Sequence, residues 1–139
     1  MSYGLAMITA RHEGTLPQHL GMEWTRAERG LVEGRFVIEK RHLAGNGFLH
    51  AATLVALMDS ACGYGAMLSL PDGAESFTTI ELKSNFLGTA REGEVTCRAV
   101  MVHGGRATQV WDAEARSSVT GKTLALFRCT QMVLWPRAA

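Results

Sequence analysis

The sequence predicts an α+β fold in which one long buried helix is wrapped by a curved antiparallel sheet of about five to six strands. The helix is expected over residues 51–68, a segment that is too long for a strand, rich in Ala, Leu and Met, and apolar on nearly every side. The sheet is expected because apolar side chains recur at every second position in the runs that follow residue 77. A helix without a polar face has to be surrounded by other elements, and a curved sheet supplies that cover.

A hairpin is expected before the helix. Residues 22–26 and 31–39 have the composition of strands, and residues 28–30 (Glu-Arg-Gly) have that of a turn. One face of the second strand collects the side chains of Val32, Phe36 and Ile38.

After the helix, a turn at residues 71–73 leads into a strand over residues 77–87. Alternation places Ile80, Leu82 and Phe86 on one face of this strand, and Thr79, Glu81, Lys83 and Asn85 on the other. Further strands are expected over residues 94–103, 106–116 and 123–134. Because the connections are short, successive strands are expected to be antiparallel neighbours.

Length and composition exclude several classes of protein. The 139 residues contain no linker or repeat, so residues 1–139 are predicted to form a single domain. Apolar residues make up 47% of the chain, which excludes a disordered protein. The 14 basic and 13 acidic residues give a net charge of +1 and are scattered, whereas a nucleic-acid binder needs a concentrated basic face.

The three cysteines and the absence of targeting signals bear on location. Cys62, Cys97 and Cys129 are an odd number, lie more than 30 residues apart in apolar runs, and are expected to be buried, reduced thiols. The first residues lack the pattern of a signal peptide. Residues 45–71 are long enough to span a bilayer but contain polar side chains and four glycines, so a membrane span is not expected. The cytoplasm is the expected location.

Asp59 stands alone as a charged residue inside the apolar helix. A carboxylate in that position has to be paired, protonated or in contact with a pocket. Pairing with a basic residue of the sheet, or capping of a backbone group, is the structural interpretation. A catalytic role is the functional one, and the helix alone does not decide between them.

The segment that leads into the helix, residues 43–50, places two glycines around Asn46 and then His50 at the helix start. The N–H groups of a first helical turn lack intrahelical partners and lie at the positive end of the helix dipole, so they can polarise a carbonyl oxygen. A plain capping loop, with His50 satisfied locally, is the alternative interpretation.

The spacing of Ala51 and Asp59 constrains any joint role. They are eight residues apart, which corresponds to about 12 Å along one helix at 1.5 Å per residue. A reacting carbonyl lies within roughly 3 Å of both its hydrogen-bond donor and its nucleophile or base. If both residues act on one substrate, two chains have to bring two helices together, and the site lies at a dimer interface.

Other motifs point to no further chemistry. The histidines outside the helix start have no metal-binding spacing, so no metal site is expected. Ser60 lacks the glycine context of a serine-hydrolase elbow. Residues 104–106 (Gly-Gly-Arg) fit a hairpin turn better than a phosphate-binding loop.

Residues 45–65 (GNGFLHAATLVALMDSACGYG) resemble the helix signature of the hotdog-fold acyl-CoA thioesterases. The resemblance is to the PaaI-like group, that of phenylacetyl-CoA and 4-hydroxybenzoyl-CoA thioesterases. Its pattern has an acidic residue nine positions after a histidine, as Asp59 follows His50 here. Residues 77–90 and 121–134 look like the strand after the helix and the last strand of that family, so the resemblance covers about residues 20–134.

The resemblance implies roles for particular residues. Asp59 matches the catalytic carboxylate, as nucleophile or as the general base that activates water. Ala51 matches the glycine whose N–H points at the thioester oxygen, and His50 matches a histidine that orients this turn. Thr79 matches a Ser/Thr position that holds the hydrolytic water. Arg106 is expected, from its position, to contact the phosphates of CoA.

This chain departs from the family pattern at two places. The His-Gly-Gly of the family is His50-Ala51-Ala52 here, and an alanine still donates its N–H. The Asn or Gln six positions before the histidine falls on Ala44, and Asn46, four positions before it, is expected to serve in its place through a shorter loop.

The resemblance therefore implies a cytoplasmic thioesterase that hydrolyses an acyl-CoA or aroyl-CoA, needs no metal or redox cofactor, and has CoA as part of its substrate. Water or Asp59 attacks the thioester carbon while the N–H of Ala51 stabilises the oxyanion. The expected assembly is a homodimer at the least, extending to a homotetramer, without nucleic acid or membrane as partners. A hotdog enoyl-CoA hydratase or dehydratase and a non-catalytic acyl-CoA-binding module are the alternatives. The position of Asp59 argues against both.

Overall fold

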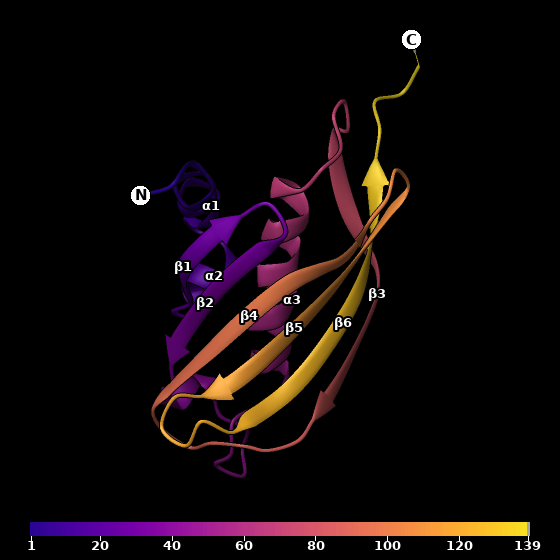
Figure 1. The fold of residues 1–139 in the computed structure, drawn as a ribbon. Coiled ribbons are helices and arrows are strands. Elements are labelled where there is room, and N and C mark those ends of the chain that lie inside the picture. Colours follow the sequence, from indigo (N-terminus) through magenta and orange to yellow (C-terminus); the bar gives the residue numbers. More distant parts are fainter. Residues whose placement is uncertain (139) are drawn as a thin grey trace.

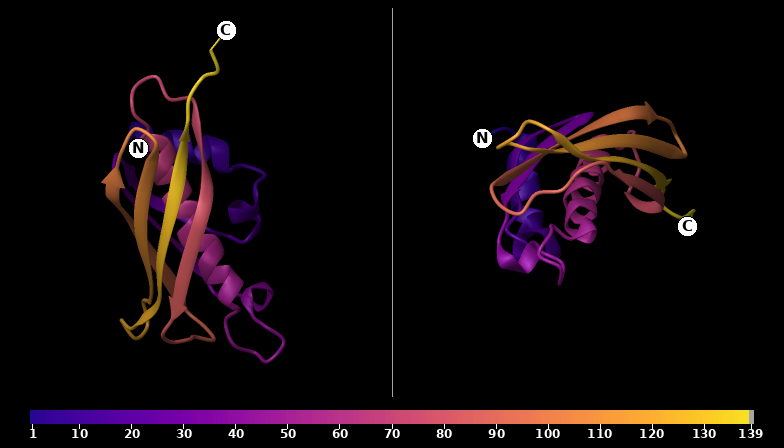
Figure 2. Two further views of the ribbon diagram at one scale, coloured as in Figure 1. Left: turned by 90° about the vertical axis from the view of Figure 1, so that its right-hand side faces the viewer. Right: turned by 90° about the horizontal axis from the view of Figure 1, so that it is seen from below.

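Six antiparallel strands form one curved sheet around a single long helix in the computed structural model, which describes residues 1–138 (Figure 1). The helix, α3 (Ala51–Leu68), lies on the concave side of the sheet, as the view from below shows (Figure 2). The sheet order is β1-β2-β4-β5-β6-β3. The strands are β1 (Glu23–Glu28), β2 (Leu31–Val37), β3 (Ser76–Phe86), β4 (Glu94–Gly104), β5 (Thr108–Ser117) and β6 (Thr123–Leu134). The predicted fold class is confirmed, and the predicted helix has the observed bounds.

Helix α3 packs closely against the sheet because small residues face it. A Cβ atom on Gly65 would lie 2.4 Å from the ring of Trp111, so glycine allows the indole of β5 to approach the helix backbone. Eight of the 18 helix residues are buried, and their apolar side chains join those of the strands in one core. The side of the helix turned away from the sheet is only half-buried, so one chain does not surround the helix completely. This core position also explains why a helix long and apolar enough to span a membrane occurs here.

Two short helices that the sequence does not predict precede the sheet. They are α1 (Tyr3–His12) and α2 (Leu16–His19). Ser2 caps α1, since its hydroxyl accepts a hydrogen bond from the N–H of Leu5 at 3.2 Å. Helix α1 is anchored on β1 by Ile8, which is fully buried, and by His12, whose Nδ1 accepts a hydrogen bond from Trp24 Nε1 at 3.1 Å.

Strand pairing follows chain order except at β3. The pairs β1–β2, β4–β5 and β5–β6 are antiparallel neighbours, as expected from their short connections. The expectation that β3 and β4 are neighbours is wrong. Strand β3 pairs with β6 at one edge, and residues 87–93 carry the chain across to β4, which pairs with β2 (Figure 1). This crossing passes the start of α3 and leaves β1 and β3 as the two edges of the sheet.

A β-bulge at Ile80 changes which side chains of β3 face the helix. Thr79 lies opposite Gln131 and Leu82 lies opposite Cys129, and both of these β6 residues are buried. Because opposed residues share a face of the sheet, Thr79 and Leu82 both point inward. The predicted placement of Thr79 on the face of Glu81, opposite Leu82, is therefore wrong, because the extra residue reverses the alternation.

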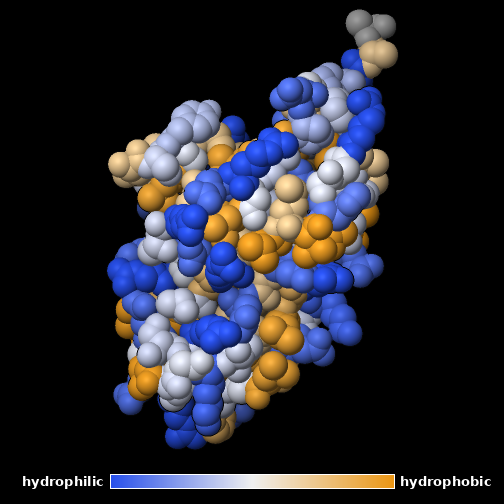
Figure 3. Space-filling model, viewed as in Figure 1, coloured by the Kyte–Doolittle hydropathy of each residue, from blue (hydrophilic) through white to orange (hydrophobic). Residues whose placement is uncertain are grey.

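The prediction for the cysteines is confirmed. Cys62, Cys97 and Cys129 are free and buried, as predicted, and burial raises the pKa of the Cys97 thiol. Over the strands in the foreground of Figure 3, hydrophilic and apolar side chains interleave.

Candidate active site

One oxygen of the Asp59 carboxyl group is buried without a hydrogen-bond partner in the described part of the chain. This atom, Oδ1, is inaccessible to solvent and has no hydrogen-bond partner among residues 1–138. Burial removes water from the carboxylate and thereby raises the pKa of Asp59 above its ordinary value. The structural interpretation of this residue, as an ion-paired or backbone-capping group, is not supported by these contacts.

Asp59 instead lines a cavity of about 390 Å³ between the helix, the edge strand and the N-terminal segment. The cavity is bounded by Arg11, Thr15, Pro17, Asp59, Ser60, Gly63, Tyr64, Met67, Phe77 and Thr79. Of the residues predicted from the sequence, Asp59 and Thr79 are brought together here. The wall supplied by α1 and α2 was missed, because no motif in those residues indicates where they dock.

Thr79 is held in place by a buried glutamine. Its hydroxyl donates a hydrogen bond of 2.7 Å to Oε1 of Gln131, a fully buried residue of β6. With its proton committed to Gln131, the Thr79 oxygen retains lone pairs that can accept a hydrogen bond from a water molecule. Gln131 was not singled out from the sequence, although its signal was present: it is a polar residue in the inward-facing series of an apolar strand.

The start of α3 leaves one N–H group free. His50 is the N-cap, and its Nδ1 accepts a hydrogen bond of 2.9 Å from the N–H of Ala52. The carbonyl of His50 accepts from the N–H of Thr53 at 3.0 Å. Within residues 1–138 the N–H of Ala51 has no acceptor, and Ala51 and His50 are exposed. His50 therefore caps the helix, and the N–H of Ala51 is still available as a donor.

Asn46 lies at the tip of the loop before the helix. Its Oδ1 accepts a hydrogen bond of 3.2 Å from the N–H of Phe48, and Gly47 takes a φ of +87° that favours glycine. Asn46, His50 and Ala51 are absent from the lining of the Asp59 cavity in the same chain. Within one chain the start of α3 and the Asp59 cavity are thus separate, about 12 Å apart along the helix.

Arg106 lies in the turn between β4 and β5, away from the Asp59 cavity. Its guanidinium stacks on the ring of Trp135 at 4.2 Å from the ring centre, and its carbonyl accepts a hydrogen bond of 3.0 Å from the indole N–H. The side chain is exposed and positively charged. Its predicted contact with CoA phosphates stays a prediction.

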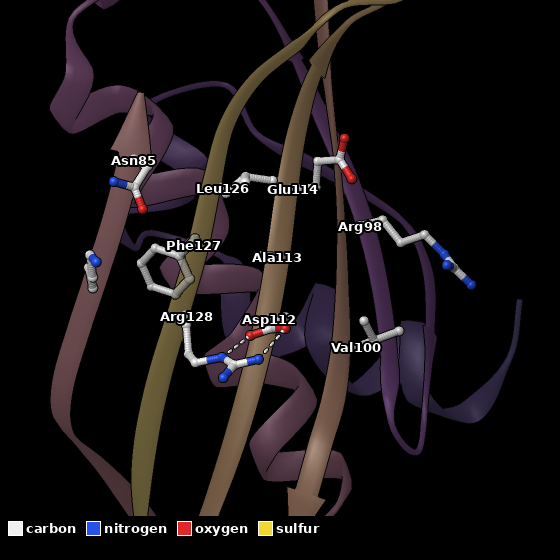
Figure 4. A pocket seen from close by; sticks show the side chains of 10 residues that line it. Asn85, Arg98, Val100, Asp112, Ala113, Glu114, Leu126, Phe127 and Arg128 are labelled. Carbon is white, nitrogen blue, oxygen red and sulfur yellow. Dashed lines mark hydrogen bonds and ion pairs between the residues drawn. The ribbon is translucent and has the colours of Figure 1, made fainter. Parts of the chain in front are cut away.

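A second recess, of about 450 Å³, lies on the convex face of the sheet, with α3 behind it (Figure 4). Two of its charged groups pair with each other: Arg128 donates hydrogen bonds of 2.5 and 2.8 Å to the two carboxylate oxygens of Asp112. The recess lies on the opposite side of the sheet from Asp59. We therefore take the smaller cavity as the candidate active site.

Comparison with known proteins agrees with this geometry. The sequence model described as "Thioesterase superfamily" matches residues 46–124. A 1,4-dihydroxy-2-naphthoyl-CoA hydrolase from Listeria monocytogenes is 31% identical over 116 residues, which are 83% of this chain and 92% of the relative. Thioesterase HI1161 from Haemophilus influenzae superposes with a TM-score of 0.87 at 25% identity, covering 96% of this chain and 92% of that one. The E. coli PaaI protein shares the fold, with a TM-score of 0.84 at 22% identity over 94% of this chain and 93% of that one.

A long helix enclosed by a six-stranded antiparallel sheet, with an unpaired carboxylate in its middle, defines a hotdog-fold thioester hydrolase. The chain belongs to the Thioesterase superfamily, and its fold is that of the PaaI-like group. Members of this family act on acyl-CoA thioesters. The resemblance noted in the sequence is thereby confirmed.

Among residues 1–138, no group of three or more His, Cys, Asp or Glu side chains is placed to hold a metal ion.

Proposed function

We propose that this chain hydrolyses an acyl-CoA or aroyl-CoA thioester to the free acid and CoA, with Asp59 as nucleophile or general base. The observation that carries the proposal is the Asp59 carboxyl group, which lines a cavity while its Oδ1 is buried without a partner among the described residues. An unpaired buried carboxylate is costly, and such groups cluster at functional sites. Its raised pKa makes it a stronger base toward water than an exposed aspartate.

Thr79 supports the same role by holding the hydrolytic water. A water molecule between the two side chains donates one proton toward Asp59 and the other to the hydroxyl oxygen of Thr79, because Gln131 already accepts the proton of Thr79. The lone pair of the water oxygen is then free to attack the thioester carbon. A C–O bond forms, the C–S bond breaks, and CoA leaves as a thiolate. If Asp59 attacks directly, the same water hydrolyses the resulting anhydride.

The oxyanion that develops on the thioester oxygen needs a donor, and we assign this role to the N–H of Ala51. This group is free within residues 1–138, is exposed, and lies at the positive end of the α3 dipole. Because about 12 Å separates it from Asp59 in one chain, the donor for each site comes from a second copy of the chain.

The edge of the sheet supports a homodimer of this kind. Strand β3 is an edge strand of 11 residues, and Ile80, Leu82 and Phe86 on it are 53%, 44% and 46% exposed. The unpaired N–H and C=O groups of an edge strand are a template for pairing with another chain, and these three side chains add apolar surface to it. A two-fold axis across β3 would place the two α3 helices side by side in opposite directions, which brings the start of each helix toward the middle of the other.

Three further residues receive supporting roles. His50 fixes the first turn of α3 through its bond to Ala52, and thereby directs the neighbouring N–H of Ala51. Asn46 stands at the same exposed end of the helix, where its amide can reach a substrate bound between chains. Arg106 offers its charge to the phosphates of CoA. Attack, oxyanion stabilisation and thiolate departure are all assigned to protein groups, water and substrate, so no further cofactor is proposed.

The test is the release of free thiol from a panel of acyl-CoA and aroyl-CoA thioesters, read with a disulfide reagent. Asp59→Asn is expected to lower turnover by about 10²-fold or more while the fold is retained, the scale expected for loss of such a group. Asp112→Asn is the matched control, because it neutralises an aspartate on the convex face outside the cavity. Near-normal turnover in Asp59→Asn, or an equal loss in both variants, would remove Asp59 from the mechanism.

A further inference from the structure

The N-terminal helix contributes a positive charge to the cavity that contains Asp59. Arg11, in the last turn of α1, lines this cavity. The turn that carries it is anchored, because the preceding Ile8 is fully buried and the adjacent His12 accepts a hydrogen bond from Trp24. These contacts fix the backbone at Arg11, whose exposed side chain lines the cavity.

Arg11 has no ion-pair partner among residues 1–138. Five other arginines pair with carboxylates: Arg26, Arg35, Arg41, Arg116 and Arg128. Asp59 does not serve as the partner of Arg11 either, because burial alone accounts for the raised pKa of that carboxyl, whereas a nearby guanidinium would lower it. The cavity thus has an unpaired anionic group and a separate unpaired cation.

The rest of the cavity wall combines apolar side chains with a few hydroxyl groups. The ring of Phe77 packs against the backbone of Gly63, 3.5 Å from where a Cβ atom would be. Met67 and Pro17 add apolar surface. A cavity of this kind binds the carbon skeleton of a ligand by burial, and the few polar groups at its wall determine specificity.

We propose that Arg11 is a specificity-determining residue that selects acyl groups carrying a carboxylate, an inference that rests on the thioesterase function proposed above. The guanidinium matches a carboxylate in geometry and charge. The phosphates of CoA are the other anionic groups of the substrate, but they lie at the far end of the long pantetheine arm. Arg11 instead lines the same 390 Å³ cavity as Asp59, where the acyl carbon has to be attacked.

The experiment compares 4-carboxybenzoyl and 4-carbamoylbenzoyl thioesters, which have nearly the same shape and differ in charge. Each is prepared on CoA and on N-acetylcysteamine, which lacks all CoA phosphates. The variants are Arg11→Gln, Arg11→Lys and, as the matched control, Arg29→Gln in the exposed turn between β1 and β2. The measured quantity is the ratio of kcat/KM for the carboxylated substrate to that for the neutral one, and thermal unfolding of each variant confirms the fold.

The wild-type protein is expected to favour the carboxylated acyl group on both carriers. Arg11→Gln should lower the ratio by about threefold to fivefold, the scale of an ion pair partly screened by solvent, and added salt should lower it as well. Arg11→Lys should keep most of the preference, and Arg29→Gln all of it. An unchanged ratio in Arg11→Gln refutes the proposal. A loss of rate that is equal for both acyl groups on CoA and absent on N-acetylcysteamine also refutes it, and assigns Arg11 to the phosphates. Failure of the wild-type protein to cleave any thioester would refute the proposed function itself.

Discussion

Complementation between two inactive variants tests whether each active site is shared by two chains. Asp59→Asn removes the proposed nucleophile or base. Ala51→Pro removes the proposed oxyanion donor, and proline suits the first position of a helix. The backbone tolerates this change, since His50 already has φ −68° and ψ 131°, the extended conformation favoured before proline, and the Ala51 N–H makes no bond within the described chain.

The expected activities follow from the distance between the two groups. Each variant alone should lose about 10²-fold or more in turnover. When equal amounts of the two chains exchange at random, about half of the dimers are mixed. A mixed dimer has one site with both defects and one with neither, because Asp59 of one chain meets Ala51 of the other. About one quarter of all sites should then be intact, so activity should recover to about one quarter of the wild-type value.

The assay is free-thiol release before and after subunit exchange, with the fraction of mixed dimers measured by native mass spectrometry. The matched control mixes Asp59→Asn chains with Asp112→Asn chains, whose substitution lies on the convex face, so subunit exchange should leave the activity of that mixture unchanged at about half of the wild-type value. Mixed dimers that form in the expected proportion without recovery of activity would show that the site is built within one chain, and the two-chain geometry would be wrong.

Two further predictions concern the same cavity. Because burial raises the pKa of Asp59, the folded chain keeps this proton at a pH where the unfolded chain has released it. The free energy of unfolding of the wild type should therefore fall as pH rises from about 4 through the raised pKa. Asp59→Asn does not titrate, so urea unfolding at equal protein concentration should show it to be more stable than the wild type at neutral pH. The difference in stability between the two proteins should vanish at acid pH. A difference that stays constant with pH would contradict a raised pKa of Asp59. Thr79→Val leaves Gln131 without its donor and removes the acceptor for water. Turnover should therefore fall about tenfold or more, and the free energy of unfolding should fall by about 1–3 kcal/mol. Thr79→Ser should retain both turnover and stability, and equal activity in the two variants would exclude a role for the hydroxyl.

The parts of the fold that depend on local sequence were predictable. Helix α3 was found at its observed bounds because its length and composition exclude a strand. The bulge at Ile80 was not found, because the alternation of apolar and polar residues continues through it without a break. The pairing of β3 with β6 was missed as well, since those strands are distant in the chain and their order depends on closure of the sheet around the helix.

The part of the candidate site that could be predicted is the one that places a charged side chain among apolar ones. Asp59 was identified because a lone carboxylate in an apolar helix has to be accounted for, and its buried oxygen without a partner confirms that it is unusual. Arg11 and Gln131 obey ordinary patterns, one at the end of a helix and the other in an alternating strand. The docking of α1 brings Arg11 to the cavity, and the register of β6 brings Gln131 to Thr79. Neither arrangement can be derived from residues near them in the sequence.

Strand β3 connects the chemistry of the site to its assembly. The bulge at Ile80 turns Thr79 inward, to the cavity that Asp59 also lines, although strict alternation would place it on the outer face with Glu81. The same strand is the edge of the sheet, so its backbone and its exposed apolar side chains are available to a second chain. A site that needs a donor about 12 Å from its carboxylate along one helix has to recruit that donor from elsewhere. In the proposed mechanism, the strand that positions the water is thus also the strand through which the missing donor arrives.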